Sequence, residues 1–380
     1  MSLFTQAHDE FRARLRKVVA AELAPHADEW ERRAELPRSS FLTLAREGVF
    51  GMHLPTACGG QGLDFGYNVV LAEELPRSGM LGLTLSMVAQ AQFFSPLLAD
   101  VGTEAQKRDF LLPAIRGEKI GALAVTEPSG GSDIVRAVKT TARDDGDFWV
   151  IDGEKKFITN GPIADFVVAL VRTRPEAATT SFTLVIVPTD TPGFRVVENL
   201  RKLGLHTSPT GWLAFEGCRV PKSLTLGKPN IGFFYAGTRL LEERLIAAAA
   251  GGAVAALVLE RTIAHLKKRH VYDKPLAELQ AVRHKIVEAA AELEMAQRFV
   301  YSLAENYRDG KVQAKEICMA KFQVVDVVYR VVERCLQLHG GEGFLDENWI
   351  TRVYRDMRVL SVGGGASEMM KDLVASYMRL

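Results

Sequence analysis

The 380-residue sequence predicts an α+β multidomain protein with an all-helical N-terminal domain, a middle β-sandwich or barrel domain and a C-terminal four-helix bundle. Apolar residues recur at helical spacing at both ends of the chain, and short β-rich runs separated by turn signals fill the middle. Strands and helices do not alternate, which argues against a doubly wound parallel sheet. We expect the three domains to span residues 1–120, 121–230 and 231–380.

The N-terminal domain is predicted to be helical up to about Phe110. Phe11, Leu15 and Val18 follow the period of a helix that has one apolar face. A proline and three glycines fall close together within residues 55–62, and this composition predicts a loop.

The middle domain is predicted from five runs rich in β-branched and aromatic residues. The first run, FWVIDGEKKFIT, contains Asp152-Gly153, where we expect a turn between two strands. Short strands without intervening helices favour a small sandwich or barrel. The other runs are DFVVALVRT, SFTLVIVPTD, GFRVVENL and GWLAFEGCRVP.

Helical spacing returns near Asn230 and continues to the last residue. Pro275, Gly310 and the glycines within 340–343 interrupt it. Helices of this kind bury their apolar faces against one another as a bundle. The expected helices span residues 231–268, 276–309, 311–339 and 367–380.

Composition argues against several classes of function. Lys and Arg number 47 against 46 Asp and Glu, a formal net charge of +1 that gives no overall field to attract nucleic acid. Residues 245–259 form a run of fifteen residues without a charged side chain, shorter than a membrane span, so we expect a buried helix there and no membrane insertion. Four separated cysteines and no signal-peptide pattern lead us to expect a cytoplasmic location.

The motifs of nucleotide, metal and serine-hydrolase sites do not occur in the sequence, and we expect no metal ion. Three polar, glycine-containing segments remain, at 125–133, 156–161 and 337–343. Each taken alone is most simply a connecting loop, although loops of this composition also present backbone N–H groups to anionic or planar ligands.

Taken together and in order, five segments resemble the acyl-CoA dehydrogenase family over essentially the whole chain. The resemblance implies FAD-dependent α,β-dehydrogenation of an acyl-CoA to the trans-2-enoyl-CoA, with a glutamate base and hydride transfer to flavin N5. It also implies a homotetramer, or a dimer of the same type, that passes electrons to an electron-transfer flavoprotein or a similar acceptor. The segments are AVTEPSGGSD (124–133), KFITNG (156–161), KKRHVYDKPLAELQ (267–280), CLQLHGGEGF (335–344) and YRDMRVLSVGGGASEMMKDLVA (354–375).

The resemblance also assigns residues to the FAD site. Some would line the flavin and its pyrophosphate in the same subunit, others would reach the FAD of a neighbouring subunit, and two near the C-terminus would contact the flavin. The first group is Val125, Thr126, Gly131, Ser132, Phe157 and Thr159; the second is Arg269, Tyr272, Gln337 and Gly341; the third is Ala366 and Glu368.

The catalytic base is the point at which the chain departs from most of the family. The usual glutamate position holds Gly364, whose N–H remains available to stabilise an enolate oxygen. The long-chain and isovaleryl-CoA dehydrogenase branch instead carries its glutamate on the first long C-terminal helix, in a Glu-Arg-Leu context. The match is Leu241-Glu242-Glu243-Arg244-Leu245, so the resemblance implies Glu243 as the base.

Helical phase alone does not select Glu243, because Arg239 lies one turn earlier and an exposed Arg239–Glu243 ion pair fits the pattern equally well. Glu368 is a second, lesser rival. By resemblance, the substrate-binding residues are Ser132, Arg244, Phe93 and Phe94. The two adjacent phenylalanines predict a short or medium acyl chain, because they occupy volume that a long chain needs.

Four departures from the family pattern bear on cofactor affinity and on the acyl carrier: Ser129, Tyr272, Asp273 and Ala366. Three alternatives therefore stay open beside the acyl-CoA dehydrogenase. One is the same chemistry on an acyl-carrier-protein thioester, another is a flavin oxidase or monooxygenase of the same fold, and the last is a non-catalytic relative. The sequence does not determine the acyl chain, the carrier or the electron acceptor.

Overall fold

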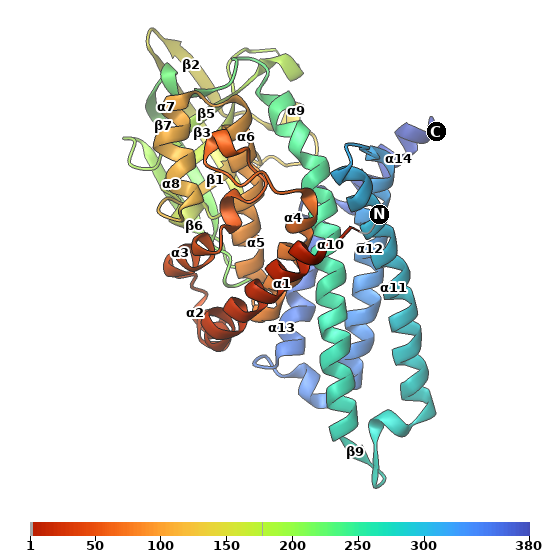
Figure 1. The fold of residues 1–380 in the computed structure, drawn as a ribbon. Helices are drawn as coiled ribbons and strands as arrows, with labels where there is room; N and C mark the ends of the chain where they lie inside the picture. Colours follow the sequence, from red (N-terminus) through yellow and green to blue (C-terminus); the bar gives the residue numbers. More distant parts are fainter. Residues whose placement is uncertain (1–2, 177) are drawn as a thin grey trace.

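The computed structural model describes residues 3–176 and 178–380, and Figure 1 shows the three parts that the sequence predicts. The predicted fold class is confirmed. In the N-terminal domain, short helices surround a core that includes Leu15, Phe41 and Val70. Its helices are α1 (Gln6–Val18), α2 (Ala27–Arg33), α3 (Ser39–Arg46), α4 (Phe65–Glu74), α5 (Leu81–Ala89), α6 (Ser95–Val101), α7 (Glu104–Gln106) and α8 (Leu112–Ile115).

The predicted loop at 55–62 lies between α3 and α4 and contains only one short 3-10 turn, Thr56–Cys58. A second irregularity joins α5 to α6: residues Gln90–Phe94 form a π-helical turn, so the two helices run on as one rod with a local change of phase.

The middle domain is a mixed sheet in the order β6-β7-β3-β2-β4-β5-β8, with β1 paired in parallel to β4. Two of its strands, β4 and β5, are buried on both faces. The strands are β1 (Gly121–Ala124), β2 (Thr141–Asp145), β3 (Phe148–Thr159), β4 (Phe166–Arg172), β5 (Phe182–Pro188), β6 (Phe194–Asn199), β7 (Thr210–Pro221) and β8 (Thr225–Leu226).

The predicted turn at Asp152-Gly153 is wrong. β3 continues through it, and only its register with β7 shifts, between Ile151 and Gly153. Gly153 has φ +143°, and a β-carbon there would lie 2.6 Å from Thr140 Cα, so glycine here permits a bulge against a close neighbour. The turn lies instead before β3, at Gly146, where φ is +66°.

The C-terminal domain consists of α10 (Gly232–Lys268), α11 (Gln280–Arg308), α12 (Ala314–Leu338), α13 (Trp349–Asp356) and α14 (Ser367–Met378). Figure 1 shows α10, α11 and α12 side by side along the bundle. A small hairpin of β9 (His270–Val271) and β10 (Lys274–Pro275) joins α10 to α11. The predicted breaks are correct to within a few residues, but α13 was not predicted, because it is only two turns long.

Two helical rods, Leu81–Val101 and Gly232–Lys268, are apolar and long enough to cross a membrane by composition alone. The apolar windows are 89% and 56% buried inside the molecule, so both rods pack as core helices.

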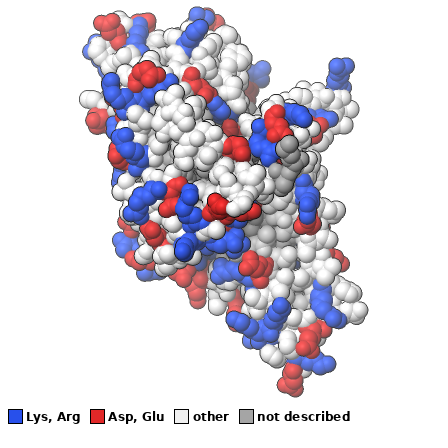
Figure 2. Space-filling view, in the orientation of Figure 1, with Lys and Arg blue, Asp and Glu red and all other residues white. Residues whose placement is uncertain are grey.

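Figure 2 shows positive and negative side chains interspersed over the visible face, without a patch of a single sign.

Candidate active site

Glu243 faces a loop of three glycines. Gly364 has φ +65°, and a β-carbon built on it would lie 3.3 Å from Glu243 Oε1. Burial raises the pKa of Glu243 to about 7, against the opposing charges of Arg244 and Lys321. A carboxylate with a pKa near neutrality is suited to accept a proton and to return it.

Two buried cations hold the glycine loop in place. Arg244 Nε donates to the carbonyl of Gly364 at 3.4 Å, and its Nη1 approaches Cys318 Sγ at 3.6 Å. Lys321 Nζ donates to the carbonyl of Gly365. The contacts of Arg244 are to the glycine loop and to Cys318, and they position the loop. Its expected contact with substrate stays a prediction.

The N–H of Gly364 has no hydrogen-bond partner in the part of the chain that the structure describes. It is therefore free to donate to a bound oxygen close to the carboxylate of Glu243. One base and one donor thus lie together, as proton removal next to a carbonyl requires.

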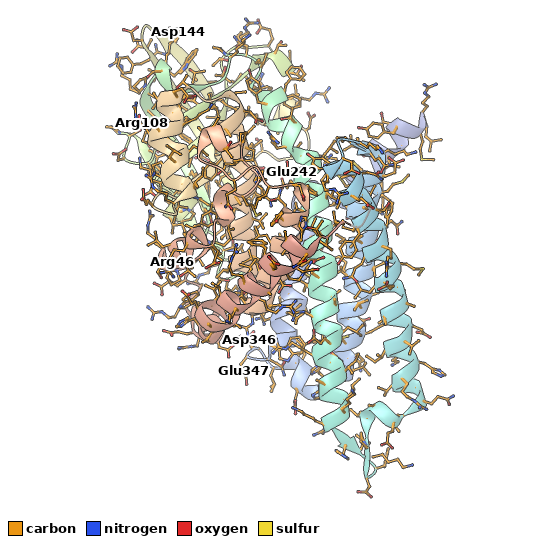
Figure 3. The ribbon with its side chains drawn as sticks, in the orientation of Figure 1. Arg46, Arg108, Asp144, Glu242, Asp346 and Glu347 are labelled. Atoms are coloured by element: carbon orange, nitrogen blue, oxygen red, sulfur yellow. The ribbon has the colours of Figure 1, made fainter. Side chains whose placement is uncertain are left out.

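The neighbouring Glu242 has a different environment. Figure 3 shows it in the upper half of α10, beside α4. Its carboxylate accepts from Asn68 Nδ2 at 3.3 Å, and it lies 3.4 Å from Arg239 Nη1 and 3.5 Å from the hydroxyl of Tyr307. Arg239 also pairs with Asp100. The Arg239–Glu243 ion pair that helical phase allowed is therefore not formed among the described residues. The other rival to Glu243 as the base, Glu368, is exposed on the first turn of α14.

The polar loop after β1 is anchored by Glu127, which sequence reasoning missed. Its buried carboxylate accepts from the N–H groups of Lys139 at 2.7 Å and Thr140 at 3.0 Å. Lys155 Nζ, also buried, donates to Glu127 at 2.8 Å and to the carbonyl of Val125 at 3.1 Å. A buried ion pair thus closes the loop, and the only signal in the sequence was a charged residue beside a proline.

The anchored loop presents the residues that the sequence singled out here. Val125 and Thr126 are half-buried, whereas Gly131 and Ser132 are exposed. A β-carbon at Gly131 would lie 3.0 Å from Thr126 Cγ2, so the backbone of the loop folds closely over Thr126.

Phe157 combines exposure with strain. Its φ is +63°, a region that bulky residues rarely adopt, and its side chain is 61% exposed. The cause is a second register shift of β3 against β7, between Lys156 and Ile158. Thr159 ends the strand, and Asn160, with φ +64°, turns the chain. Strain of this kind is typical of functional sites, and here it presents an aromatic ring beside the polar loop.

Arg269 and Tyr272 lie far from Glu243 in the same chain. Both follow the C-terminal end of α10, and Tyr272 is 89% exposed in the hairpin. Figure 1 shows this hairpin at the end of the bundle opposite α14. Arg269 follows Glu243 by 26 residues, which corresponds to about 39 Å of α-helix.

Gln337 and Gly341 lie at the same end as Arg269. The rings of His265 on α10 and His339 after α12 stack at 4.2 Å, so the two helices end together. The structure therefore separates the predicted residues into two groups, one around Glu243 and Phe157 and one at the far end of the bundle.

The two phenylalanines expected to bind substrate point in different directions. Phe94 is fully buried, and its ring packs edge-on against Phe166 of β4 at 5.3 Å, as a core residue does. Phe93 is half-buried and packs against the cluster that includes Leu245 of α10. Of the two phenylalanines, only Phe93 thus packs toward α10, the helix that carries Glu243.

Comparisons with known proteins cover the whole chain. Models of the N-terminal, middle and C-terminal domains of acyl-CoA dehydrogenase match residues 5–118, 122–218 and 230–378. The chain is 35% identical over 376 residues to 3-(aryl)acrylate reductase of Clostridium sporogenes, which covers 99% of both proteins. It is 34% identical to the mitochondrial long-chain specific acyl-CoA dehydrogenase of Sus scrofa, covering 98% of this chain and 86% of that protein.

A solved structure agrees with these sequence matches. The acyl-CoA dehydrogenase from Geobacillus kaustophilus has a TM-score of 0.94 at 36% identity, and the match covers 99% of each chain.

Proposed function

The chain belongs to the acyl-CoA dehydrogenase family, and on this premise we propose that it catalyses α,β-dehydrogenation of an acyl-CoA with Glu243 as the base. As a member of this family it is a FAD-dependent oxidoreductase. The observation that carries the proposal is the contact between Glu243 and Gly364, since it unites a base of near-neutral pKa with a free N–H donor.

The residues of the middle domain fit FAD. Phe157 offers an exposed ring near the end of β3, and the loop held by Glu127 offers backbone and hydroxyl groups at Thr126 and Ser132. We propose that these residues, with Val125, Gly131 and Thr159, hold the flavin and its pyrophosphate. FAD supplies the acceptor for the β-hydrogen when it is bound.

The chain's own residues then perform the proton chemistry. Glu243 takes the proton from the α-carbon of the thioester, while the N–H of Gly364 donates to the thioester oxygen, where negative charge develops. Arg244 and Lys321 act indirectly: they bind the carbonyls of Gly364 and Gly365 and thereby orient the N–H of Gly364. A positioned base contributes about 10²- to 10⁴-fold in rate.

A second candidate is the reverse reaction, reduction of a 2-enoyl thioester. It is favoured by the similarity to 3-(aryl)acrylate reductase, whose name states that it reduces a double bond beside a carboxyl group. The same carboxylate would deliver a proton to the α-carbon, for which a pKa near neutrality is equally suited. The potential of the electron partner decides which direction prevails.

We propose an oligomer in which the far end of one bundle completes the FAD site of a neighbouring subunit. The support is the exposed set at that end: Tyr272 at 89% exposure and Phe344 at 92%, beside the exposed Arg269, Gln337 and Gly341. By family analogy the assembly is a homotetramer, and the electron partner is an electron-transfer flavoprotein or a similar acceptor.

The test is anaerobic titration of the FAD-loaded protein with acyl-CoA thioesters, following the flavin absorbance and identifying the product. We expect bleaching and a trans-2-enoyl-CoA, with slow reoxidation in air. Bleaching by reduced dye followed by reoxidation with an enoyl-CoA would favour the reverse reaction. Stoichiometric hydrogen peroxide at the turnover rate, or an oxygenated product, would overturn both in favour of an oxidase or monooxygenase.

A further inference from the structure

Gln92 is an unusual buried residue. It lies in the π-helical turn Gln90–Phe94 and is 3% exposed, yet neither atom of its amide has a hydrogen-bond partner within the described residues. Leaving a buried amide unpaired costs roughly 1–3 kcal/mol per group, so a folded protein rarely keeps one without a ligand or water to bind. Helical turns of the π type also occur often at functional sites.

Gln90, two residues earlier in the same turn, has an amide whose hydrogen bonds are formed. Its amide donates to the carbonyls of Ala114 and Lys119, and its oxygen accepts from the N–H of Gly121 at 3.1 Å. The turn itself therefore does not prevent hydrogen bonding. Gln92 is unpaired because no described residue places a donor or acceptor within hydrogen-bond distance of its amide.

Two further polar groups lack partners in this region. Both ring nitrogens of His53 are buried and unpartnered within residues 3–176 and 178–380, and so is Nε of Arg239. Burial, and secondarily the charge of Arg239, lower the pKa of His53 to about 4, so its ring is neutral and offers one donor and one acceptor. The charge of Arg239 is already matched by Asp100 and Glu242.

These groups come from elements that pack against one another next to the base. The turn Val49–Gly51, just before His53, packs against the π-helical turn, and the π-helical turn packs against α10. Arg239 precedes Glu243 by one turn of α10, about 6 Å along the helix. The unpaired atoms therefore lie in or beside elements that pack against one another, and one of these elements, α10, also carries Glu243.

We propose that Gln92, His53 and Arg239 form a subsite for an uncharged oxygen function, a hydroxyl, ether or carbonyl, carried by the acyl group beyond its reacting carbons. An unsubstituted alkyl chain would leave the donors and acceptors unpaired. A carboxylate would meet no uncompensated cation, because Arg239 is already paired. This inference rests on the proposed function, since it names the substrate class of the same site.

The test compares two thioesters of equal size, 6-hydroxyhexanoyl-CoA and heptanoyl-CoA, in anaerobic flavin reduction. We expect the wild-type protein to favour the hydroxyacyl-CoA by about tenfold or more in kcat/KM, because a site built for hydrogen bonds discriminates against the analogue that lacks them. Gln92→Leu should abolish or reverse that preference, and His53→Leu should reduce it.

Gln90→Leu is the matched control, since it makes the same substitution two residues away at a satisfied amide. It should lower the melting temperature and leave the preference unchanged. Gln92→Leu should instead keep or raise the melting temperature of the ligand-free protein, because it removes an unpaired buried amide. This readout does not depend on activity.

The outcomes separate this inference from the proposed function. If both thioesters reduce the flavin and Gln92→Leu leaves their ratio unchanged, the subsite is overturned while the dehydrogenase stands, and water then satisfies the amide. If neither these two nor any other acyl-CoA thioester reduces the flavin, the proposed function fails. The ratio of their dissociation constants by calorimetry, in wild type and Gln92→Leu, then decides the subsite alone.

Discussion

The carboxylate of Glu243 lies against Gly364, 3.3 Å from the position that a β-carbon on that glycine would take. The first is in the long helix α10, the second in the loop before α14, and folding brings them together. In most of the family the base belongs to the loop position, and here the glycine leaves room for a base supplied by the helix. On the proposed assignment of Glu243 as the base, this contact places the carboxylate beside the usual position, which has no side chain.

Replacing the base should abolish chemistry without abolishing binding. We expect Glu243→Gln to bind FAD and to slow flavin reduction by about 10²- to 10⁴-fold in stopped-flow measurements. Glu242→Gln is the matched control and should change that rate little, because Glu242 contacts Asn68, Arg239 and Tyr307. Full activity in Glu243→Gln would show that another group is the base.

Moving the base should restore part of the rate. Because Gly364 lies beside Glu243, the double variant Glu243→Ala/Gly364→Glu places a carboxylate in nearly the same space. We expect a higher reduction rate than in Glu243→Ala alone but a lower one than in wild type, since φ +65° strains a residue other than glycine. No recovery in a folded, FAD-bound double variant would argue against this arrangement.

The pH dependence of flavin reduction should report the pKa of Glu243. Only the ionised carboxylate accepts a proton, so the rate should rise with pH through about 7 and level off above it. Lys321→Met removes a nearby cation that favours the ionised form, so its midpoint should move to higher pH. Lys315→Met, at a half-exposed lysine on the same helix, is the control, and equal profiles in both variants would refute a role for Lys321.

Breaking the buried ion pair that anchors the polar loop after β1 should destabilise the protein. Glu127→Gln leaves Lys155 charged and without its partner, and removing one member of a buried pair costs about 3–5 kcal/mol. We expect a lower midpoint in urea unfolding of the FAD-free protein, and weaker FAD binding. Lys139→Met keeps the backbone N–H that bonds Glu127, so a comparable loss there would contradict this assignment.

Subunit sharing of the FAD site predicts complementation. Because Arg269 lies about 39 Å from Glu243 along one helix, we expect the two to serve different sites. Glu243→Gln and Arg269→Ala chains, each inactive alone, should give partial activity when co-expressed with different tags and purified as mixed oligomers. Activity of Arg269→Ala alone, with normal FAD affinity, would exclude the intersubunit role.

The sequence was sufficient for the order of the domains and for most helix ends. Proline and glycine at Pro275 and Gly310 act on the backbone locally, so their effect is visible without the fold. At Gly153 the sequence predicted a turn, whereas the structure has a bulge within β3. Glycine marks an unusual backbone, but only the packing against Thr140 decides which kind it is.

The sequence by itself determined that a Glu-Arg pair lies on a helix and that glycines occupy the loop before α14. Only the tertiary structure decided that Glu242 pairs with Arg239 while Glu243 faces Gly364, and that Glu127 anchors the polar loop after β1. It also decided that the amide of Gln92 has no partner among the described residues. Helical phase and turn chemistry act between neighbours in the chain. Burial and pairing depend on groups from distant segments, because a charge or an amide is satisfied by whatever the fold places within about 3 Å of it.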